Sequence, residues 1–511
     1  MNTQREIFGI MGLPPEVLAV AMAKYSRSKA SIKVTIDDLT EEKSAKFHEK
    51  WVLGYGDASV ADMALIAIAL ENVSILASKA IQDNRLASYQ EKSTRYVGFE
   101  PDRVFQPANL LKSAYGPLYQ ETMRTLFGAY EQVLGLMKGL YTRMHPKTSE
   151  MTDALYEARI TARSLDVARY LLPPATLTNF GMIMSARSLR HCISKLKASP
   201  LPEIREIGAE IQKAAVEYSY HPRAAKANDL LAQLLNHQDA KVKAIAAAIK
   251  QVVALNIKGA PTLVKHTEPK EYLVKKSAVL SKLASKYLTK VKLAKSEPRV
   301  DFMAEYLDPE IELVATLLYG ASKLSFRQIV KCVLGLKSSQ RQEIIENVQA
   351  ERGPHDWPSR EFEVGQGFIF DLLMDYGSFR DLQRHRLTTQ INQALTIDHG
   401  FEYPRDLKEA GGQAIFEKGV AASQKAYRKI VKDFPHEARY VVAMGFRKRT
   451  LFKMNLRELF HILELRSKPG GHFSYRDICW QMYEQFKSRH SVLAQSFRIK
   501  KMDYHNEFFM R

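Results

Sequence analysis

The sequence of this 511-residue chain contains an internal repeat, and the repeat limits the fold more than any other feature. Residues 167 to 191, VARYLLPPATLTNFGMIMSARSLRH, align without a gap to residues 437 to 461, EARYVVAMGFRKRTLFKMNLRELFH, at an offset of 270. Upstream, NRLASYQEKSTRY (84 to 96) corresponds to HRLTTQINQALTI (385 to 397) at an offset of 301. Because chance rarely produces such matches, we infer a duplication.

The duplication predicts a fold of two similar halves. Because the two offsets differ, the first half carries about 31 more residues between its motifs than the second. Between the halves the chain is rich in Ala and Lys, with a Gly- and Pro-containing break, KGAPTLVKHTEPKEY. We therefore expect an α+β fold in which two helix-rich mixed α/β domains, residues 1–220 and 301–511, are joined by a helical connector, residues 221–300.

Local patterns add three expected elements. Apolar residues at helical spacing predict one helix leading into the first motif and one helix in the second half. The first stripe is formed by Val73, Leu76, Ala77, Ala80 and Ile81, and the second by Leu456, Leu459, Phe460 and Leu463. The β-branched run IKVTI, residues 32–36, predicts a short strand.

Composition narrows the function classes. The net charge of +19 favours anionic partners, but many lysines alternate with apolar residues in helical segments, as on a solvated helix face. Nucleic-acid binding is therefore the less favoured reading of the charge. No window is apolar enough to span a membrane, and the N-terminus lacks a signal-peptide core, so we expect a cytoplasmic protein. Cys192, Cys332 and Cys479 form no CxxC pair and predict no metal site.

The two halves carry different polar residues at corresponding positions. The second half has the basic triplet Arg384, His385 and Arg386. Because adjacent cations repel one another, this triplet indicates that an anion binds to it. At the first two of these places the first half has Asp83 and Asn84. The first half instead carries a polar segment that the second half lacks, formed by Ser88, Glu91, Ser93 and Arg95.

Taken together, these segments resemble the signature of the flavin-dependent thymidylate synthases, the ThyX family. The signature runs Arg-His-Arg, then a Ser, an acid, a Ser and Arg-Tyr, and the ARY and NLRELFHILELR segments resemble the same family's C-terminal part. The resemblance covers about residues 50–215 and 350–500. It implies methylation of dUMP to dTMP, with methylenetetrahydrofolate as carbon donor, NADPH as reductant and FAD as cofactor, and without a cysteine nucleophile. GQGFIF lacks the third glycine of a dinucleotide fingerprint, so a Rossmann domain is not expected.

The resemblance also implies roles for individual residues. Arg466 stands where the family's arginine stabilises negative charge on the pyrimidine, and a guanidinium acts there as an electrostatic stabiliser. The implied nucleotide-binding residues are Glu91, Ser93, Arg95, Arg384, Arg169 and Arg439. The implied flavin-binding residues are Ser88, Arg384, His385, Arg386, Asn455, Arg457 and His461. Because Arg457 and Arg466 point half a turn apart on an ideal helix, either they serve different ligands or the helix ends between them.

Neither half holds every signature residue. The second half has Thr389, Asn392, Ala394 and Thr396 where the first has its polar segment, and the first half has Leu196 in place of Arg466. We therefore expect one site composed from both halves, within one chain or across two. Since the family is typically a homotetramer, two tandem chains would form a homodimer that acts as a pseudo-tetramer.

Other readings of the same residues stay open. The chain could be a non-catalytic relative that still binds flavin or nucleotide, or a related enzyme that alkylates C5 of another pyrimidine nucleotide. Arg187 and Arg457 taken singly resemble surface arginines, and we expect His191 to be a core histidine. His355 could stack on folate, but a turn-capping role is favoured.

Overall fold

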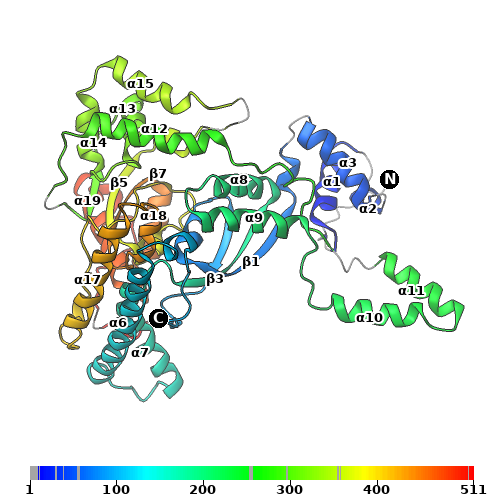
Figure 1. Cartoon of the computed structure of the whole chain (residues 1–511), viewed down its shortest axis with the longest axis horizontal. Coiled ribbons are helices and arrows are strands. Elements are labelled where there is room, and N and C mark those ends of the chain that lie inside the picture. Colours follow the sequence, from blue (N-terminus) through cyan, green and yellow to red (C-terminus); the bar gives the residue numbers. More distant parts are fainter. Residues whose placement is uncertain are drawn as a thin grey trace. The chain divides into compact units, whose positions relative to one another are not determined.

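A computed structural model of the chain gives the architecture (Figure 1). It describes residues 8, 10, 12–28, 31–37, 39–54, 58–252, 257–294, 297–353, 356, 358–504 and 506–510. His355 lies outside these residues. Within the described ranges, no helix combines the length and the apolar character needed to cross a membrane.

The chain is helix-rich and contains two small sheets, which agrees with the expected mixed α/β class. The strands are β1 Leu65–Ser74, β2 Ala87–Glu91, β3 Leu177–Ser185, β4 Val300–Met303, β5 Phe368–Asp375, β6 Thr389–Asn392 and β7 Arg447–Met454. The helices up to residue 252 are α1 Pro15–Tyr25, α2 Ile32–Asp37, α3 Glu41–Phe47, α4 Ile75–Ile81, α5 Ala108–Leu111, α6 Gly116–Met144, α7 Asp153–Ala168, α8 Ala186–Lys197, α9 Pro202–Val216, α10 Ala224–Leu235 and α11 Ala240–Val252. The later helices are α12 Glu271–Leu288, α13 Pro309–Tyr319, α14 Phe326–Leu334, α15 Ser338–Gln349, α16 Tyr376–Leu382, α17 Gln413–Ile430, α18 Leu456–Arg466, α19 Phe473–Arg489 and α20 Ser491–Ala494. Short 3-10 or π turns are η1 His48–Gly54, η2 Val60–Asp62, η3 Arg169–Leu171, η4 Arg360–Phe362, η5 Arg405–Leu407 and η6 Glu437–Val441.

Two compact units make up the chain. Unit 1 comprises Met1–Leu70, Leu86–Gln90 and Gly181–Lys270, and unit 2 comprises Glu71–Arg85, Glu91–Phe180 and Glu271–Arg511. Unit 2 therefore takes residues from both repeats. The bounds of these units differ from the predicted division at 1–220, 221–300 and 301–511. That division describes the repeats, and it stays a prediction.

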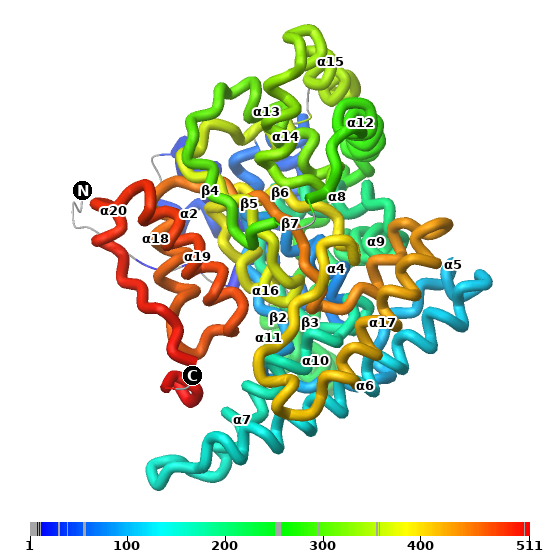
Figure 2. Tube along the Cα trace, turned by 90° about the vertical axis from the view of Figure 1, so that its left-hand side faces the viewer, coloured from blue at the N-terminus to red at the C-terminus, as the bar shows by residue number. Residues whose placement is uncertain are grey.

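The duplication is visible in the strand order. The first sheet has the order β1-β3-β2 and the second has β4-β5-β7-β6. At the offsets of the repeat, β1 corresponds to β5, β3 to β7 and β2 to β6, so the shared three-strand order is the same. In the second sheet, shown in Figure 2, β7 lies between β5 and β6 and is antiparallel to both. Asp375 of β5 lies opposite Arg447, and Asn392 of β6 lies opposite Thr450.

The strand predicted at residues 32–36 is wrong, because this segment forms the helix α2. Its N-terminal residue Ile32 is buried, and α2 packs against α1. The same arrangement of helices occurs in the second repeat. At an offset of 294 residues, α1 corresponds to α13, and the first residue of α2 corresponds to the first residue of α14. Packing against a helical neighbour thus overrides the weak strand preference of Val34 and Thr35.

The extra residues of the first half form a helix. There the chain runs from α6 through α7 into η3, whereas the second half runs from α17 directly into η6. The helix α6 packs against both α7 and α17 (Figure 1). The insertion matters for the site because α7 supplies an acidic residue to it.

Helices lie on both sides of the connector's Gly- and Pro-containing break. Its helices α10 and α11 belong to unit 1, and they pack against each other. Its last helix, α12, belongs to unit 2 and packs against α13 and α15.

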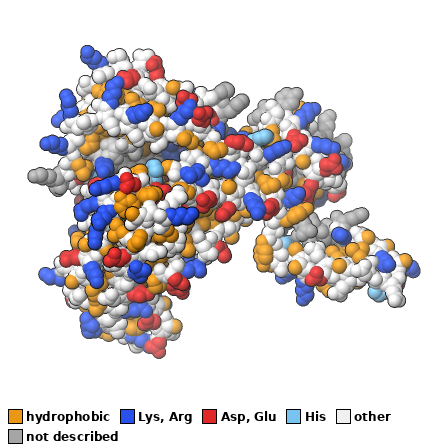
Figure 3. Space-filling model, viewed as in Figure 1, with side chains coloured by type: hydrophobic (Ala, Val, Ile, Leu, Met, Phe, Trp, Pro, Cys, Tyr) orange, Lys and Arg blue, Asp and Glu red, His pale blue; other side chains and the backbone are white. Residues whose placement is uncertain are grey.

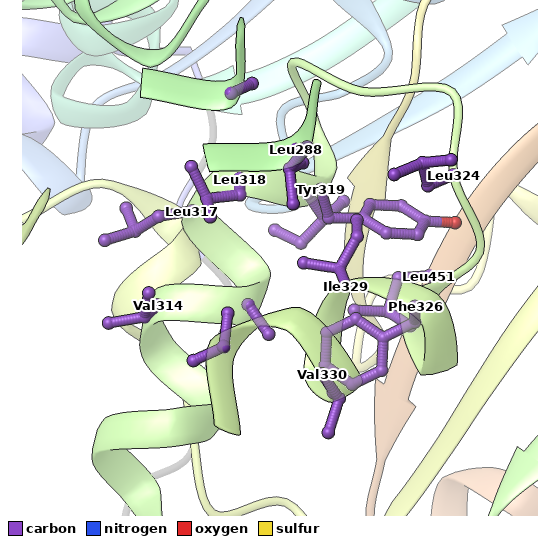
Figure 4. Close-up of a cluster of buried hydrophobic side chains, with 14 of the residues drawn as sticks. Leu288, Val314, Leu317, Leu318, Tyr319, Leu324, Phe326, Ile329, Val330 and Leu451 are labelled. Carbon is purple, nitrogen blue, oxygen red and sulfur yellow. The ribbon is translucent and has the colours of Figure 1, made fainter. Parts of the chain in front are cut away.

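A hydrophobic core in unit 2 supports the second sheet (Figure 4). Helices α12 to α15 contribute most of its residues, including Val314 and Leu317 of α13 and Ile329 of α14. Ile391 of β6 and Leu451 of β7 join the same cluster. Burial of this apolar surface holds the strands that lead into the candidate site.

Candidate functional site

The first half contributes a buried carboxylate to unit 2. Glu91 ends β2, and its side chain is fully buried. Three side chains of the preceding segment donate to it: Ser78 Oγ at 2.9 Å, Lys79 Nζ at 2.7 Å and Gln82 Nε2 at 3.1 Å. A buried carboxylate needs such partners, because desolvation strongly penalises an unpaired charge.

The second half reaches the same carboxylate. Arg380 Nη2 lies 3.0 Å from Glu91 Oε1, and Arg384 Nη2 lies 3.7 Å from Oε2. Although burial opposes ionisation, Lys79 and the two arginines hold the pKa of Glu91 below its usual range. Burial also lowers the pKa of Lys79, to about 8, against the effect of Glu91. Residues of the two repeats therefore share one buried ionic cluster within a single chain.

Two equivalent short helices position this cluster. The helix α4 begins where Ser74 Oγ accepts from the Ala77 N–H at 3.0 Å, and α16 begins where Asp375 Oδ1 accepts from the Ser378 N–H at 2.7 Å. These caps, and the cations Lys79 and Arg380, are related by the offset of 301. Side-chain caps fix the starts of such short helices, so each places its cation at a defined point.

In the predicted Ser-x-Arg segment of unit 2, Ser93 is half-buried, whereas Arg95 is buried and already has partners. Arg95 donates to Asp166 through Nε at 2.8 Å and Nη2 at 3.3 Å, to Tyr475 Oη at 3.2 Å and to the Gly470 carbonyl at 3.0 Å. Ser93 Oγ accepts from the Arg95 N–H at 3.2 Å. Although burial opposes it, Asp166 raises the pKa of Arg95, so the pair is ionic. Asp166 comes from the insertion helix α7.

Arg169 has unused hydrogen-bond donors in the same cluster. Its side chain is 1% exposed, its Nη1 lies 3.5 Å from Thr94 Oγ1, and its Nη2 lies 3.5 Å from Asp381 Oδ2. Its Nε and Nη2, and Nε of Arg380, are buried without a hydrogen-bond partner among the described residues. Buried donors are rarely left unpaired in proteins, so Nε of Arg169 and Nε of Arg380, which also lack an ion pair, are candidate donors to an oxyanion.

The basic triplet divides between the interior and the surface. Arg384 and Arg386 are exposed, whereas His385 is buried. Arg466 Nε donates to His385 Nε2 at 2.9 Å, so the imidazole proton lies on Nδ1 and is donated to Glu458 Oε1 at 3.0 Å. Burial lowers the pKa of His385, although Glu458 opposes this, and the neutral ring is the form that this network requires.

Arg466, the residue expected to act on the pyrimidine, and Arg95 both lie over the ring of Tyr475. The guanidinium carbons of Arg466 and Arg95 lie 5.8 Å and 5.6 Å from the centre of the Tyr475 ring. Because α18 is continuous, it does not end between Arg457 and Arg466. Arg457 is exposed, whereas Arg466 turns toward His385.

The structure places the remaining predicted residues at the margin of the cluster or away from it. Asn455 caps α18 by accepting from the Glu458 N–H at 3.0 Å. His461 is exposed, with Nδ1 3.5 Å from Glu458 Oε2 and its ring 5.1 Å from that of His385. Ser88 is exposed and belongs to unit 1. Arg439 lies in unit 2, where its hydrogen bond is with His436.

His385, Glu458 and His461 bring their potential ligand atoms within 4.8 Å of one another. A metal ligand must offer a lone pair, but Nδ1 of His385 carries the proton that Glu458 accepts. The hydrogen bonds of this trio are thus those of an orienting network rather than of a metal centre.

The motifs in the sequence did not indicate several residues of the cluster. They are Lys79, Asp166, Arg380, Asp381 and Tyr475. Extending the repeat alignment upstream would have found a basic residue at the same place in both halves, Lys79 and Arg380. Asp166 lies in the insertion, next to the aligned block, and only folding brings it to Arg95.

Comparison with known proteins assigns the family. The profile described as thymidylate synthase complementing protein matches residues 11–219 and 308–490. The chain belongs to this family. One matched segment lies in each repeat, so the chain is a tandem-duplicated member.

Relatives of the chain fall into two sets. A UPF0159 protein of Chlamydia pneumoniae is 28% identical over 93% of this chain and 88% of its own length, and one of Thermoplasma acidophilum is 26% identical over 93% of each. A flavin-dependent thymidylate synthase of Clostridium tetani is 25% identical over 39% of this chain and 79% of its own length. A solved ThyX structure from Helicobacter pylori with FAD and dUMP is 16% identical, covers 40% of this chain and 89% of its own, and has a TM-score of 0.23. The names of the nearly full-length relatives state no activity, and the family assignment rests on the profile match.

Proposed function

We propose that this protein is a flavin-dependent thymidylate synthase with one site per chain, composed from both repeats. One observation carries the proposal: Glu91 of the first repeat lies within ion-pair distance of Arg380 and Arg384 of the second. The signature residues that each half lacks would thus be supplied by the other half. The substrate is dUMP, which is methylated with methylenetetrahydrofolate and NADPH.

The unpaired buried donors support nucleotide binding. Nε of Arg169 and Nε of Arg380 would donate to the nucleotide phosphate, and the hydroxyl of Ser93 would add a further donor. Arg95 would either bind the phosphate itself, once the phosphate replaces Asp166 as its partner, or orient Tyr475 through their hydrogen bond. Charge-assisted bonds of this kind are stronger than neutral ones, and a guanidinium suits the geometry of phosphate oxygens.

Arg466 would act on the pyrimidine. Its Nε is held by His385, whereas its Nη groups have no hydrogen bond to the described residues. Preorganised donors that stabilise developing negative charge supply a large part of catalysis. The neutral His385, itself held by Glu458, fixes the direction of this guanidinium without competing for its Nη groups.

The exposed cationic and aromatic side chains around His385 suit FAD. Arg384, Arg386 and Arg457 are exposed, and the His461 ring lies beside that of His385. These residues would hold the anionic and ring portions of the flavin. When bound, the reduced flavin supplies the hydride that this reaction requires.

The deciding test is formation of dTMP from dUMP, methylenetetrahydrofolate and NADPH by the purified protein. Turnover that depends on all three supports the proposal. A protein that binds flavin without forming dTMP would instead be a non-catalytic relative. The Arg95–Asp166 pair favours that second candidate, because it already occupies the donors expected for the nucleotide.

Changing Arg384 to Ala should lower FAD affinity about tenfold or more, because the flavin loses a charged donor. Flavin content after gel filtration measures this. A matched control is Arg428→Ala, an exposed arginine of α17. If Arg384→Ala and Arg386→Ala both kept the full flavin content, the triplet would not be the flavin site.

The composite site should lie within one chain, with one flavin and one nucleotide bound per chain. Arg95→Ala and Arg466→Ala proteins, each of strongly reduced activity, should therefore gain no activity after they are mixed and allowed to exchange subunits. The expectation follows from the contacts that join both arginines to one Tyr475 in the same chain. Recovery of activity on mixing would show that sites are formed across chains.

A further inference from the structure

In unit 2, a helix of the connector covers the first helices of the second repeat. The helix α12 packs against α13, α14 and α15. Its Leu283 and Leu288 join a buried cluster with Tyr319 of α13 and Ile329 of α14 (Figure 4). Tyr319 and Ile329 are fully buried. The connector thus closes the apolar face that α13, α14 and α15 form.

The corresponding face of the first repeat is open. At the offset of 294 residues, α1 and α2 correspond to α13 and α14. Tyr25 stands at the place of Tyr319, and Thr35 stands at the place of Ile329. Tyr25 is 48% exposed, and Thr35 is half-buried. This face of unit 1 therefore lacks the cover that α12 provides in unit 2.

A pocket of about 620 Å³ opens on this face of unit 1. Its lining residues all lie between positions 23 and 51, and they include the apolar Ala23, Val34, Phe47 and Trp51 and the cations Lys24 and Arg27. The centres of the Phe47 and Trp51 rings lie 6.4 Å apart, and Val34 is 62% exposed. Such a lining suits the apolar side chains of a covering helix, with the cations left to face water or an acid.

The connector also forms an arm from the helices α10 and α11. The two helices pack against each other, and a backbone bridge between Tyr218 and Lys258 closes the base of the arm. Among the described residues of α10 and α11, only Leu231 and Ala246 are buried. Helices of 12 and 13 residues are marginally stable when they bury so little. The arm would therefore be stabilised by packing against a further apolar surface.

Apolar side chains lie exposed on this arm, as Figure 3 shows. Leu230 and Leu234 of α10 are 50% and 40% exposed, and Ile245 and Ile249 of α11 are 60% and 40% exposed. Within each pair the residues lie one turn apart, on one face of their helix. Leu230 and Ile245 each directly precede a buried residue, and in two antiparallel helices this position falls on the same side of the hairpin. The arm thus presents one apolar face.

We propose that the arm of one copy of this chain docks in the open pocket of a second copy, so that two chains exchange arms. Each copy has one arm and one pocket, so a twofold-symmetric pair fills both pockets and leaves neither arm exposed. Within one copy, none of the residues that line the pocket comes from the arm. The connector then covers both repeats: α12 covers the second repeat of its own chain, and the arm covers the first repeat of the partner. This interface does not depend on the proposed catalytic activity.

Chemical cross-linking tests whose arm fills the pocket. One chain carries Val34→Cys in the pocket, and a second chain, with a different affinity tag, carries Ile249→Cys on the arm. Both chains also carry Cys332→Ser, because Cys332 is only partly buried. After co-expression and treatment with a short bismaleimide, we expect a covalent dimer that carries both tags. The matched control has Leu334→Cys in place of Val34→Cys; Leu334 is 63% exposed, and this pair should give no such dimer.

A lysine variant tests the apolar face of the arm. Adding Ile245→Lys to the Ile249→Cys chain should lower the yield of the mixed covalent dimer about tenfold or more, because docking would bury the ammonium group. The control Ala247→Lys lies on the same helix but directly follows the buried Ala246, so it faces the other side of the hairpin and should leave the yield unchanged. Circular dichroism establishes that each variant keeps its helix content.

Several results would show that the proposal is wrong. A cross-link within a single chain that carries both cysteines, without any mixed dimer, would assign the arm to the pocket of its own chain. The absence of every cross-link, or an equal yield with Leu334→Cys, would equally contradict arm exchange. Sedimentation velocity should show that the unmodified protein is a dimer, and a protein that stays monomeric would overturn the proposal. Because these experiments measure association, they stand or fail independently of dTMP formation.

Discussion

Replacing Arg466 by Ala should lower the turnover number for dTMP formation by a factor of about 10² to 10³, as is typical when one preorganised donor to a developing negative charge is removed. Its flavin content should stay close to that of the unmodified protein, because Arg466 contacts His385 and Tyr475 rather than the exposed margin where the flavin is proposed to bind. Steady-state kinetics with saturating dUMP, together with the flavin absorbance of the purified protein, measure both quantities.

Two further variants separate this role from structural damage. Arg466→Lys keeps the charge but loses the planar fork, so it should recover only part of the rate. Leu196→Ala alters the corresponding buried position of the first repeat and should reduce stability while leaving kcat within about twofold. If Arg466→Ala lowered flavin content as much as turnover, or if Leu196→Ala inactivated a folded protein, the assignment of roles to the two halves would be wrong.

Replacing Glu91 by Ala should destabilise the protein by about 3 to 5 kcal/mol, the usual result of removing one partner from a buried ionic cluster. Lys79 and Arg380 would then remain buried without their shared carboxylate. Urea unfolding measured at pH 7 gives the difference in free energy. The control is Glu271→Ala, which removes an exposed ion pair with Lys275 and should leave the unfolding midpoint unchanged.

The effect of Glu91 should also depend on pH in a defined direction. Its pKa is lowered in the folded protein, so its stabilising contribution is fully present above the unfolded value of about 4.3 and is lost as pH falls toward the folded value. Between about pH 7 and 5 the stability difference between the unmodified protein and Glu91→Gln also includes the titration of Lys79, whose pKa of about 8 falls further once the carboxylate is removed. Below about pH 4 that difference should shrink, because Glu91 becomes protonated. A difference that did not change with pH in this range would contradict an ionised Glu91.

The sequence named candidate site residues because they stand at fixed spacing in two segments that resemble the family signature. Glu91, Arg384, His385 and Arg466 were all named from this resemblance, and the structure brings them into one unit. The strand expected at residues 32–36 was wrong because five residues of local preference cannot outweigh packing against a neighbouring helix. At an offset of 294, Ile32 aligns with Phe326, where the helix α14 begins, so the second repeat indicates a helix at this place.

The sequence alone therefore determined the duplication, the family resemblance and the complementary loss of signature residues, all of which depend on order along the chain. Only the tertiary structure decided that the two repeats share one ionic cluster within a chain and that Asp166 from the insertion binds Arg95. The reason is physical: whether a buried charge is paired depends on distances across the fold, and residues as far apart as Glu91 and Arg380 acquire such a distance only when the chain packs.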